Sequence, residues 1–231
     1  MAPIKYQVKL SDFWRSKAII TPSNASFPTY TADFSWLISR KPTPSIVLRR
    51  VLQDNQEVTL SSEPNSSNLP PATSTEILGA VDLDLLSLSK PIYITFQDPL
   101  GTHYTSSPLW KPVEVNNKWT TNGFVLTLPR TDGEEGEGRR FCWKRTADIT
   151  KEKKQNVVMR KLDWLHLKLV DEEGKTVATF VHDCSPGWNR GDFVFEEEMA
   201  GGTGLVDFER VVILSGLGVV EYVRKVAGFS W

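Results

Sequence analysis

The segment VDFERVVILSGLGVVEYVRKVAG, residues 206–228, gives the strongest structural signal in the chain. Its apolar residues cover every face of a helix instead of one stripe, so a helix built from it must be surrounded by protein. Asp207 is placed to cap a helix over 207–227, and Gly228 is placed to end it. The many β-branched residues leave a second interpretation open, two strands that turn near Ser215. Charges of the right sign at both ends favour the helix.

This stretch is too short to span a membrane. Its apolar part is interrupted by Ser215 and bounded by Arg210 and Glu221, which leaves roughly half of the ~20 residues that a span needs. The start of the chain, MAPIKYQVKLSDFW, lacks the apolar run of a secretory signal. Cys142 and Cys184 are too few for a disulfide framework or for a zinc site of four ligands. We therefore expect a cytoplasmic protein without a transmembrane segment, metal or cofactor.

The composition indicates one β-rich domain over residues 1–231. The chain is 40% hydrophobic and contains eight Trp and eleven Phe, side chains that pack well on pleated strands. The formal net charge of −1 gives no bulk attraction to nucleic acid. No nucleotide, dinucleotide or paired-cysteine motif is present in the sequence, which disfavours nucleotide, hydride and zinc chemistry.

Short β-branched and aromatic runs predict strands through residues 4–52 and again from Pro91. Between them, residues 53–80 are rich in Ser, Asn, Pro and Thr, and we expect a mobile insertion there. The clearest hairpin is DWLHLKLVDEEGKTVATFVHD, residues 163–183, in which apolar and polar residues alternate. Gly174 is placed at its turn, where a positive φ is needed.

Three segments together resemble the tubby C-terminal-like fold. They are this hairpin, the strand-like WNRGDFVFEE (188–197) and the helical DFERVVILSGLGVVEYVRK (207–225). Tubby proteins, phospholipid scramblases and LURP-one-related proteins share that fold, and the tail is similar to tubby-like proteins of filamentous fungi. The resemblance implies a mainly β protein, an antiparallel β-barrel closed around a buried apolar C-terminal helix. The 53–80 insertion departs from the family, and so does the lack of a clear basic cluster for phosphoinositides.

The densest polar cluster is FVHDCSPGWNRGD, residues 180–192. In a site at the barrel mouth, His182 or Asp183 would transfer protons, Arg190 would hold an anionic group and Trp188 would form a stacking wall. The alternative is a structural loop in which Asp183 caps turn amides and Arg190 pairs with a carboxylate.

Glu221 is a further catalytic candidate, because a carboxylate in an apolar helix must be paired or reach solvent. Buried, it would act as an acid with a raised pKa. Alternatively the helix emerges from the barrel there, which the following Arg224 favours. His103 and Tyr104 follow a turn, and Trp164 lies on the polar face of the hairpin. These three are candidate ligand contacts.

Three functions stay open from the sequence, and one of them is an interaction module in which residues 53–80 are the contact segment. Another is a binding or scaffold barrel for a lipid headgroup or a hydrophobic small molecule, as the resemblance implies. The alternative to such a barrel is a cofactor-independent cyclase or isomerase that acts on a hydrophobic metabolite. A helix that fills the barrel would move either of the last two functions to the rim and the loops.

Overall fold

The computed structural model describes residues 3–11, 16–35, 44–52, 74–83, 92–96, 114–115, 123–128, 139–146, 166–183, 189–196 and 205–226. The described strands form one antiparallel sheet of twelve strands. The elements in chain order are β1 (Ile4–Leu10), β2 (Lys17–Pro22), β3 (Tyr30–Phe34), β4 (Ile46–Val51), β5 (Thr75–Asp82), β6 (Tyr93–Phe96), β7 (Glu114–Val115), β8 (Gly123–Leu128), β9 (Arg139–Arg145), β10 (Leu167–Val170), β11 (Thr176–His182), β12 (Asn189–Phe195) and α1 (Leu205–Val226).

The sheet consists of two meanders that meet where β1 pairs with β12. Its order is β6-β5-β4-β3-β2-β1-β12-β11-β10-β9-β8-β7, so almost every strand lies beside its neighbours in sequence. The exception joins the two ends of the chain, with Ile4 opposite Phe195 and Tyr6 opposite Phe193. This pairing joins the two meanders into one sheet.

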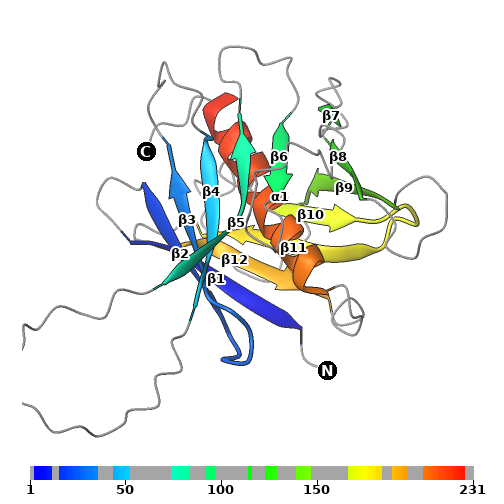
Figure 1. The fold of residues 1–231 in the computed structure, drawn as a ribbon. Coiled ribbons are helices and arrows are strands. Elements are labelled where there is room, and N and C mark those ends of the chain that lie inside the picture. Colours follow the sequence, from blue (N-terminus) through cyan, green and yellow to red (C-terminus); the bar gives the residue numbers. More distant parts are fainter. Residues whose placement is uncertain are drawn as a thin grey trace, which may run out of the picture.

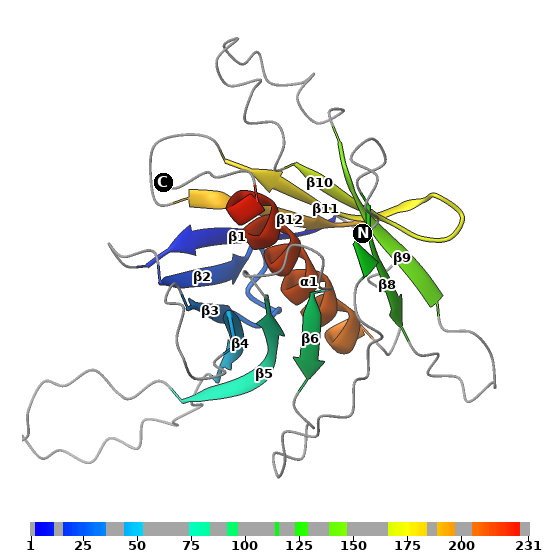
Figure 2. The ribbon, with the colours of Figure 1, turned by 90° about the horizontal axis from the view of Figure 1, so that it is seen from above.

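The sheet curls around α1 but does not close into a barrel among the described strands. Figure 2 shows α1 in the middle, with β1 to β6 on one side and β8 to β12 on the other. Short strands form the two edges, β6 with four residues and β7 with two, and each pairs with one described neighbour. The closed antiparallel barrel expected from the resemblance is therefore corrected to an open, curled sheet.

The helix prediction for the C-terminal stretch is confirmed, and the alternative of two strands is wrong. Every residue from 211 to 221 is buried, because α1 runs across the concave side of the sheet (Figure 1). The helix begins at Leu205, so Asp207 lies within its first turn and not at the position before that turn, where it was predicted. No helix in the described part of the chain is long and apolar enough to cross a membrane.

Two polar contacts join α1 to the sheet within the core. The hydroxyl groups of Tyr6 on β1 and Tyr30 on β3 both donate to Glu209 Oε1, the latter over 2.6 Å. The indole Nε1 of Trp143 on β9 donates to Ser215 Oγ over 2.9 Å. Each contact satisfies a buried polar group that would otherwise destabilise the core.

A third contact links Glu221 to Arg190 on β12, and the spacing of the three helix residues explains why they reach different strands. Glu209, Ser215 and Glu221 are six residues apart. Six residues turn a helix by about 240°, so the three side chains leave the axis in directions about 120° apart. A helix enclosed by a curled sheet can use all three directions.

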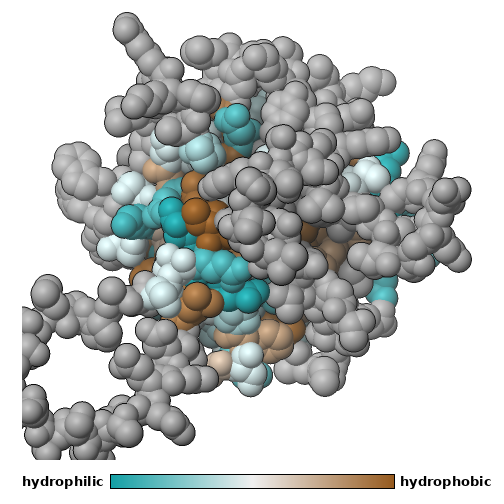
Figure 3. Space-filling view, viewed as in Figure 1, coloured by the Kyte–Doolittle hydropathy of each residue, from teal (hydrophilic) through white to brown (hydrophobic). Residues whose placement is uncertain are grey.

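The hairpin prediction is confirmed, with β10 and β11 antiparallel and Gly174 at φ 81°. The predicted insertion at 53–80 ends too late, because β5 begins at Thr75. Residues 53–73 lie outside the described residues. Ile19 and Leu52 are the large hydrophobic side chains exposed among those described. On the face in Figure 3, hydrophilic and hydrophobic described residues are interspersed, as expected for strands with one side facing solvent.

Candidate functional site

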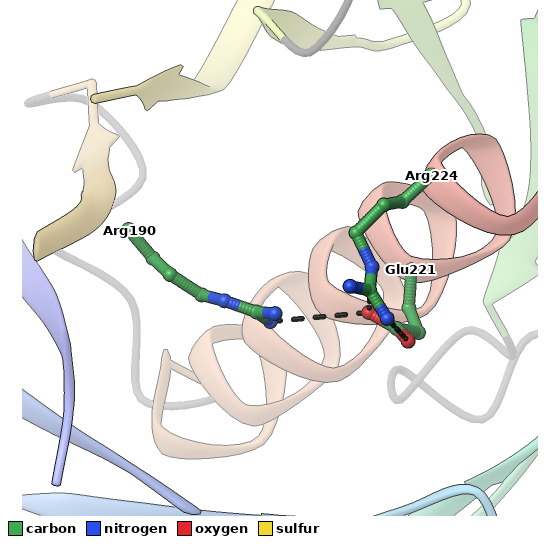
Figure 4. A network of polar contacts seen from close by, with 3 residues as sticks. All are labelled: Arg190, Glu221 and Arg224. Carbon is green, nitrogen blue, oxygen red and sulfur yellow. Dashed lines mark hydrogen bonds and ion pairs between the residues drawn. The ribbon is translucent and has the colours of Figure 1, made fainter. Parts of the chain in front are cut away.

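Four residues singled out in the sequence lie close together at the carboxyl-terminal half of α1. His182 ends β11, Asp183 follows it, and Arg190 lies at the start of β12. The backbone N–H of Asp183 donates to the carbonyl oxygen of Arg190 over 3.1 Å. The Arg190 side chain then extends to α1, where one terminal nitrogen lies 3.9 Å from Glu221 Oε2 (Figure 4).

A β-bulge aims Arg190 at the helix. On β1, Val8 pairs with Gly191 and Lys9 pairs with Asn189, so Arg190 is the extra residue between two paired ones. Alternation along an unbroken strand would place Arg190 on the same side as Asp192, away from the helix. A bulge shifts this alternation and redirects one side chain. Arg190 consequently points inward, and its side chain is only 12% exposed.

Gly191 makes this bulge sterically feasible. Its φ of +144° is a conformation that other residues rarely adopt. A Cβ atom at this position would lie 2.4 Å from the carbonyl oxygen of Val181 on the neighbouring strand. Gly191 therefore permits the backbone conformation in which Arg190 turns inward.

Glu221 is buried and held by two arginines. Arg224 Nε donates to Oε2 over 3.1 Å, and Arg224 Nη2 donates to Oε1 over 2.6 Å. Such a two-point contact is the strongest arrangement of a guanidinium and a carboxylate. Glu221 is 2% exposed and Arg224 is 6% exposed. The interpretation that α1 emerges into solvent here is therefore wrong, because the carboxylate is paired inside the protein.

The aromatic ring of Phe34 supports the Arg190 guanidinium. The central carbon of that group lies 4.9 Å from the ring centroid, within the range of a cation–π contact. Phe34 ends β3 and is 5% exposed. The guanidinium is thus positioned by an apolar surface and by Glu221.

His182 is held in its neutral form. Burial lowers its pKa to about 4, and the nearby His166 and Arg190 act in the same direction, against the opposing charge of Asp183. Its backbone N–H donates to Nδ1 of His166 over 3.1 Å, and His166 is itself buried. Asp183 Oδ2 accepts a hydrogen bond from the Asn189 side chain over 2.8 Å. These contacts fix the polar groups at this end of the sheet.

A second buried polar cluster was not recognised from the sequence. Burial raises the pKa values of Tyr6 and Tyr30 above that of a free tyrosine, and Glu209 adds to both shifts. Burial also raises the pKa of Glu209, against the opposing effects of the two tyrosine hydrogen bonds and of Arg50. The available signal was a carboxylate within an apolar helix, the same signal that identified Glu221.

The remaining candidates, His103, Tyr104, Trp164 and Trp188, lie outside the described residues. Within the described ranges, no group of three or more His, Cys, Asp or Glu side chains is placed to hold a metal ion. The candidate site is therefore built here from Arg190, its bulge and the groups around it.

Comparison with known proteins gives no match, whether the sequence is compared with protein-family models and curated proteins or the fold with solved structures. The resemblance to the tubby C-terminal-like fold stays a prediction from the residues quoted for it. The side chains themselves therefore carry the functional argument.

Proposed function

We propose that the protein binds an anionic amphiphile at the end of the curled sheet where Arg190 lies. The single observation that carries this proposal is the β-bulge that turns Arg190 from the outer side of the sheet toward α1. A guanidinium is a good partner for a carboxylate or a phosphate, because its planar N–H groups match their oxygens. A free amphiphile and a lipid headgroup share this chemistry.

The packed interior supports a site at the rim rather than in the lumen. Residues 211–221 of α1 are buried, and the sheet side chains that surround them form one hydrophobic core. An apolar ligand inside the sheet would have to displace the helix. The ring of Phe34, which is 5% exposed, is the apolar group directly beside the guanidinium of Arg190. A ligand with an anionic group next to an apolar chain matches both features.

The cyclase or isomerase alternative has less support from these groups. A general base works best when its pKa lies near the operating pH. The pKa of His182, about 4, makes its imidazole a weak base at neutral pH. The carboxylate of Asp183 accepts a hydrogen bond from Asn189, so one of its oxygens is already engaged within the protein.

Calorimetric titration with dodecyl phosphate and dodecanoate, and with dodecanol as the uncharged comparison, tests the proposal. We expect both anions to bind more tightly than the alcohol. R190Q should weaken anion binding by about 10- to 100-fold, the effect of losing a hydrogen bond to a charged group. The matched control is R49Q, because Arg49 is also a sheet arginine paired with a carboxylate, Asp33, over 3.1 Å.

Co-sedimentation with phosphatidylcholine vesicles, with and without phosphatidylserine, distinguishes the two sources of the ligand. Binding to the anionic vesicles that weakens at high salt indicates a lipid headgroup. Binding of the monomeric amphiphiles alone indicates a free ligand. The proposal is wrong if no anion binds, or if R190Q and R49Q have the same effect.

A further inference from the structure

We infer that Glu221 competes with the ligand for Arg190, so that the bound anion replaces the Glu221 carboxylate at this guanidinium. The inference rests on the proposed function and adds a residue that sets the affinity of the site. It also restricts the ligand, because only a group with a full negative charge can take the place of a carboxylate in an ion pair.

The contact distances rank the two arginines around Glu221. Arg224 binds both carboxylate oxygens, over 2.6 and 3.1 Å, whereas the nearest nitrogen of Arg190 lies 3.9 Å away. The Arg190 contact is too long for a hydrogen bond and is a charge attraction alone. The pair formed by Arg190 and Glu221 is therefore the weaker one, and an incoming anion separates it more easily.

The exposed fractions of the three side chains also single out Arg190 as the group that an incoming anion can reach. The side chain of Glu221 is 3% exposed, that of Arg224 is 7% exposed and that of Arg190 is 12% exposed. An anion that approaches from solvent reaches Arg190 before the other two groups. Arg190 also comes from the sheet, whereas Glu221 and Arg224 lie on α1, so the exchange leaves the helix pair intact.

Arg224 makes the exchange energetically feasible. A buried carboxylate that loses its last partner destabilises a protein strongly, because its charge is then neither paired nor solvated by water. When Arg190 turns to a ligand, both oxygens of Glu221 keep the contacts with Arg224. Glu221 and Arg224 thus form a stable pair beside the site, and Arg190 is shared between Glu221 and the ligand.

The substitution E221Q tests the competition, because glutamine keeps the shape of the side chain and removes its charge. We expect E221Q to bind dodecyl phosphate about 3- to 5-fold more tightly than the wild type, the effect of removing one competing ion pair. The matched control is D192N. Asp192 lies two residues from Arg190 on β12, and its carboxylate pairs with Lys5 over 2.9 Å. D192N should change the affinity by less than about twofold, since it removes the same charge away from the guanidinium.

A second variant keeps the test decisive if E221Q does not fold. R224K preserves the charge but cannot hold both oxygens of Glu221 at once. Glu221 then pairs more closely with Arg190, and we expect weaker binding of dodecyl phosphate, by about threefold. Circular dichroism of each variant checks that α1 is intact.

The outcomes separate this inference from the proposed function. If the wild type binds no anion, or if R190Q binds as well as the wild type, the proposed function fails and the inference falls with it. If binding depends on Arg190 but E221Q binds no more tightly than D192N, only the competition is refuted. The same conclusion follows if R224K binds as tightly as the wild type.

Discussion

Replacing Gly216 with alanine measures how closely the sheet encloses α1. A Cβ atom at Gly216 would lie 2.5 Å from Cε1 of Phe193 and 3.2 Å from Cζ2 of Trp143. At Gly218, two residues further along the same buried helix, a Cβ atom would lie 3.1 Å from Cγ1 of Val81. The first distance requires a ring to move, whereas the second requires a shift of a few tenths of an ångström. The two positions therefore form a matched pair.

The magnitude follows from two opposing effects. Alanine is about 1 kcal/mol more favourable than glycine in a helix interior, so both substitutions gain this amount. An additional carbon in a well-packed core costs about 1–3 kcal/mol. Phe193 and Trp143 have no exposed surface, so the upper part of that range applies to G216A. We expect G216A to lower the free energy of unfolding by about 1–2 kcal/mol, and G218A to change it by less than about 1 kcal/mol.

Urea denaturation followed by circular dichroism provides the measurement. The wild type, G216A and G218A should have similar slopes, so that a lower midpoint for G216A reports a loss of stability. If G216A is as stable as G218A, or more stable, then Phe193 and Trp143 do not pack against α1 as described. The sheet would then not enclose α1 closely at Gly216.

Three further predictions concern buried polar groups. The pKa of His182 is about 4 in the folded protein, against an ordinary value of 6.5. The contribution of His182 to the free energy of unfolding is therefore complete above pH 6.5 and is lost as the pH falls toward 4, by about 3 kcal/mol at most. In urea denaturation at a series of pH values, H182Q should lose less stability in acid than the wild type. The pKa values of Tyr6 and Tyr30 are raised, so these tyrosines stabilise the folded protein fully below pH 10 and less as the pH rises above it. Y30F should reduce this loss of stability at alkaline pH. An unchanged loss would contradict the burial of the Tyr30 hydroxyl group. S215A removes the acceptor of the Trp143 indole and should cost about 1–3 kcal/mol in the same assay, whereas a neutral effect would contradict this contact.

Local patterns were sufficient to predict the helix and the hairpin. Apolar residues on all sides of α1 and charged ends identified a buried helix, and Gly174 marked the turn between β10 and β11. Strand β5 was missed because its four consecutive buried positions, Leu78 to Val81, include Gly79 and Ala80. Small residues give little hydrophobic signal and no alternation. The open edges of the sheet could not be predicted from strand patterns, since the closure of a sheet into a barrel depends on pairing between distant strands.

For the candidate site, the sequence indicated residues that lie close together along the chain but not the contacts between distant ones. His182, Asp183 and Arg190 were identified because they lie close together in the sequence. The ion pair of Arg190 with Glu221 depends on a bulge between β1 and β12, which pairing in space creates. The Tyr6–Glu209 contact joins residues 203 positions apart. Interactions of this kind require the fold, because local sequence carries no trace of them.

Binding of an anion by the bulged Arg190 can be observed directly at the Arg190 side chain. In protein labelled with ¹⁵N at arginine, the Nε–Hε resonance of Arg190 is assigned by its absence from R190K. On titration with dodecyl phosphate, we predict that this resonance shifts to saturation with the Kd found by calorimetry, whereas that of Arg49 does not move. Saturable binding without a shift at Arg190, or with an equal shift at Arg49, would contradict the account.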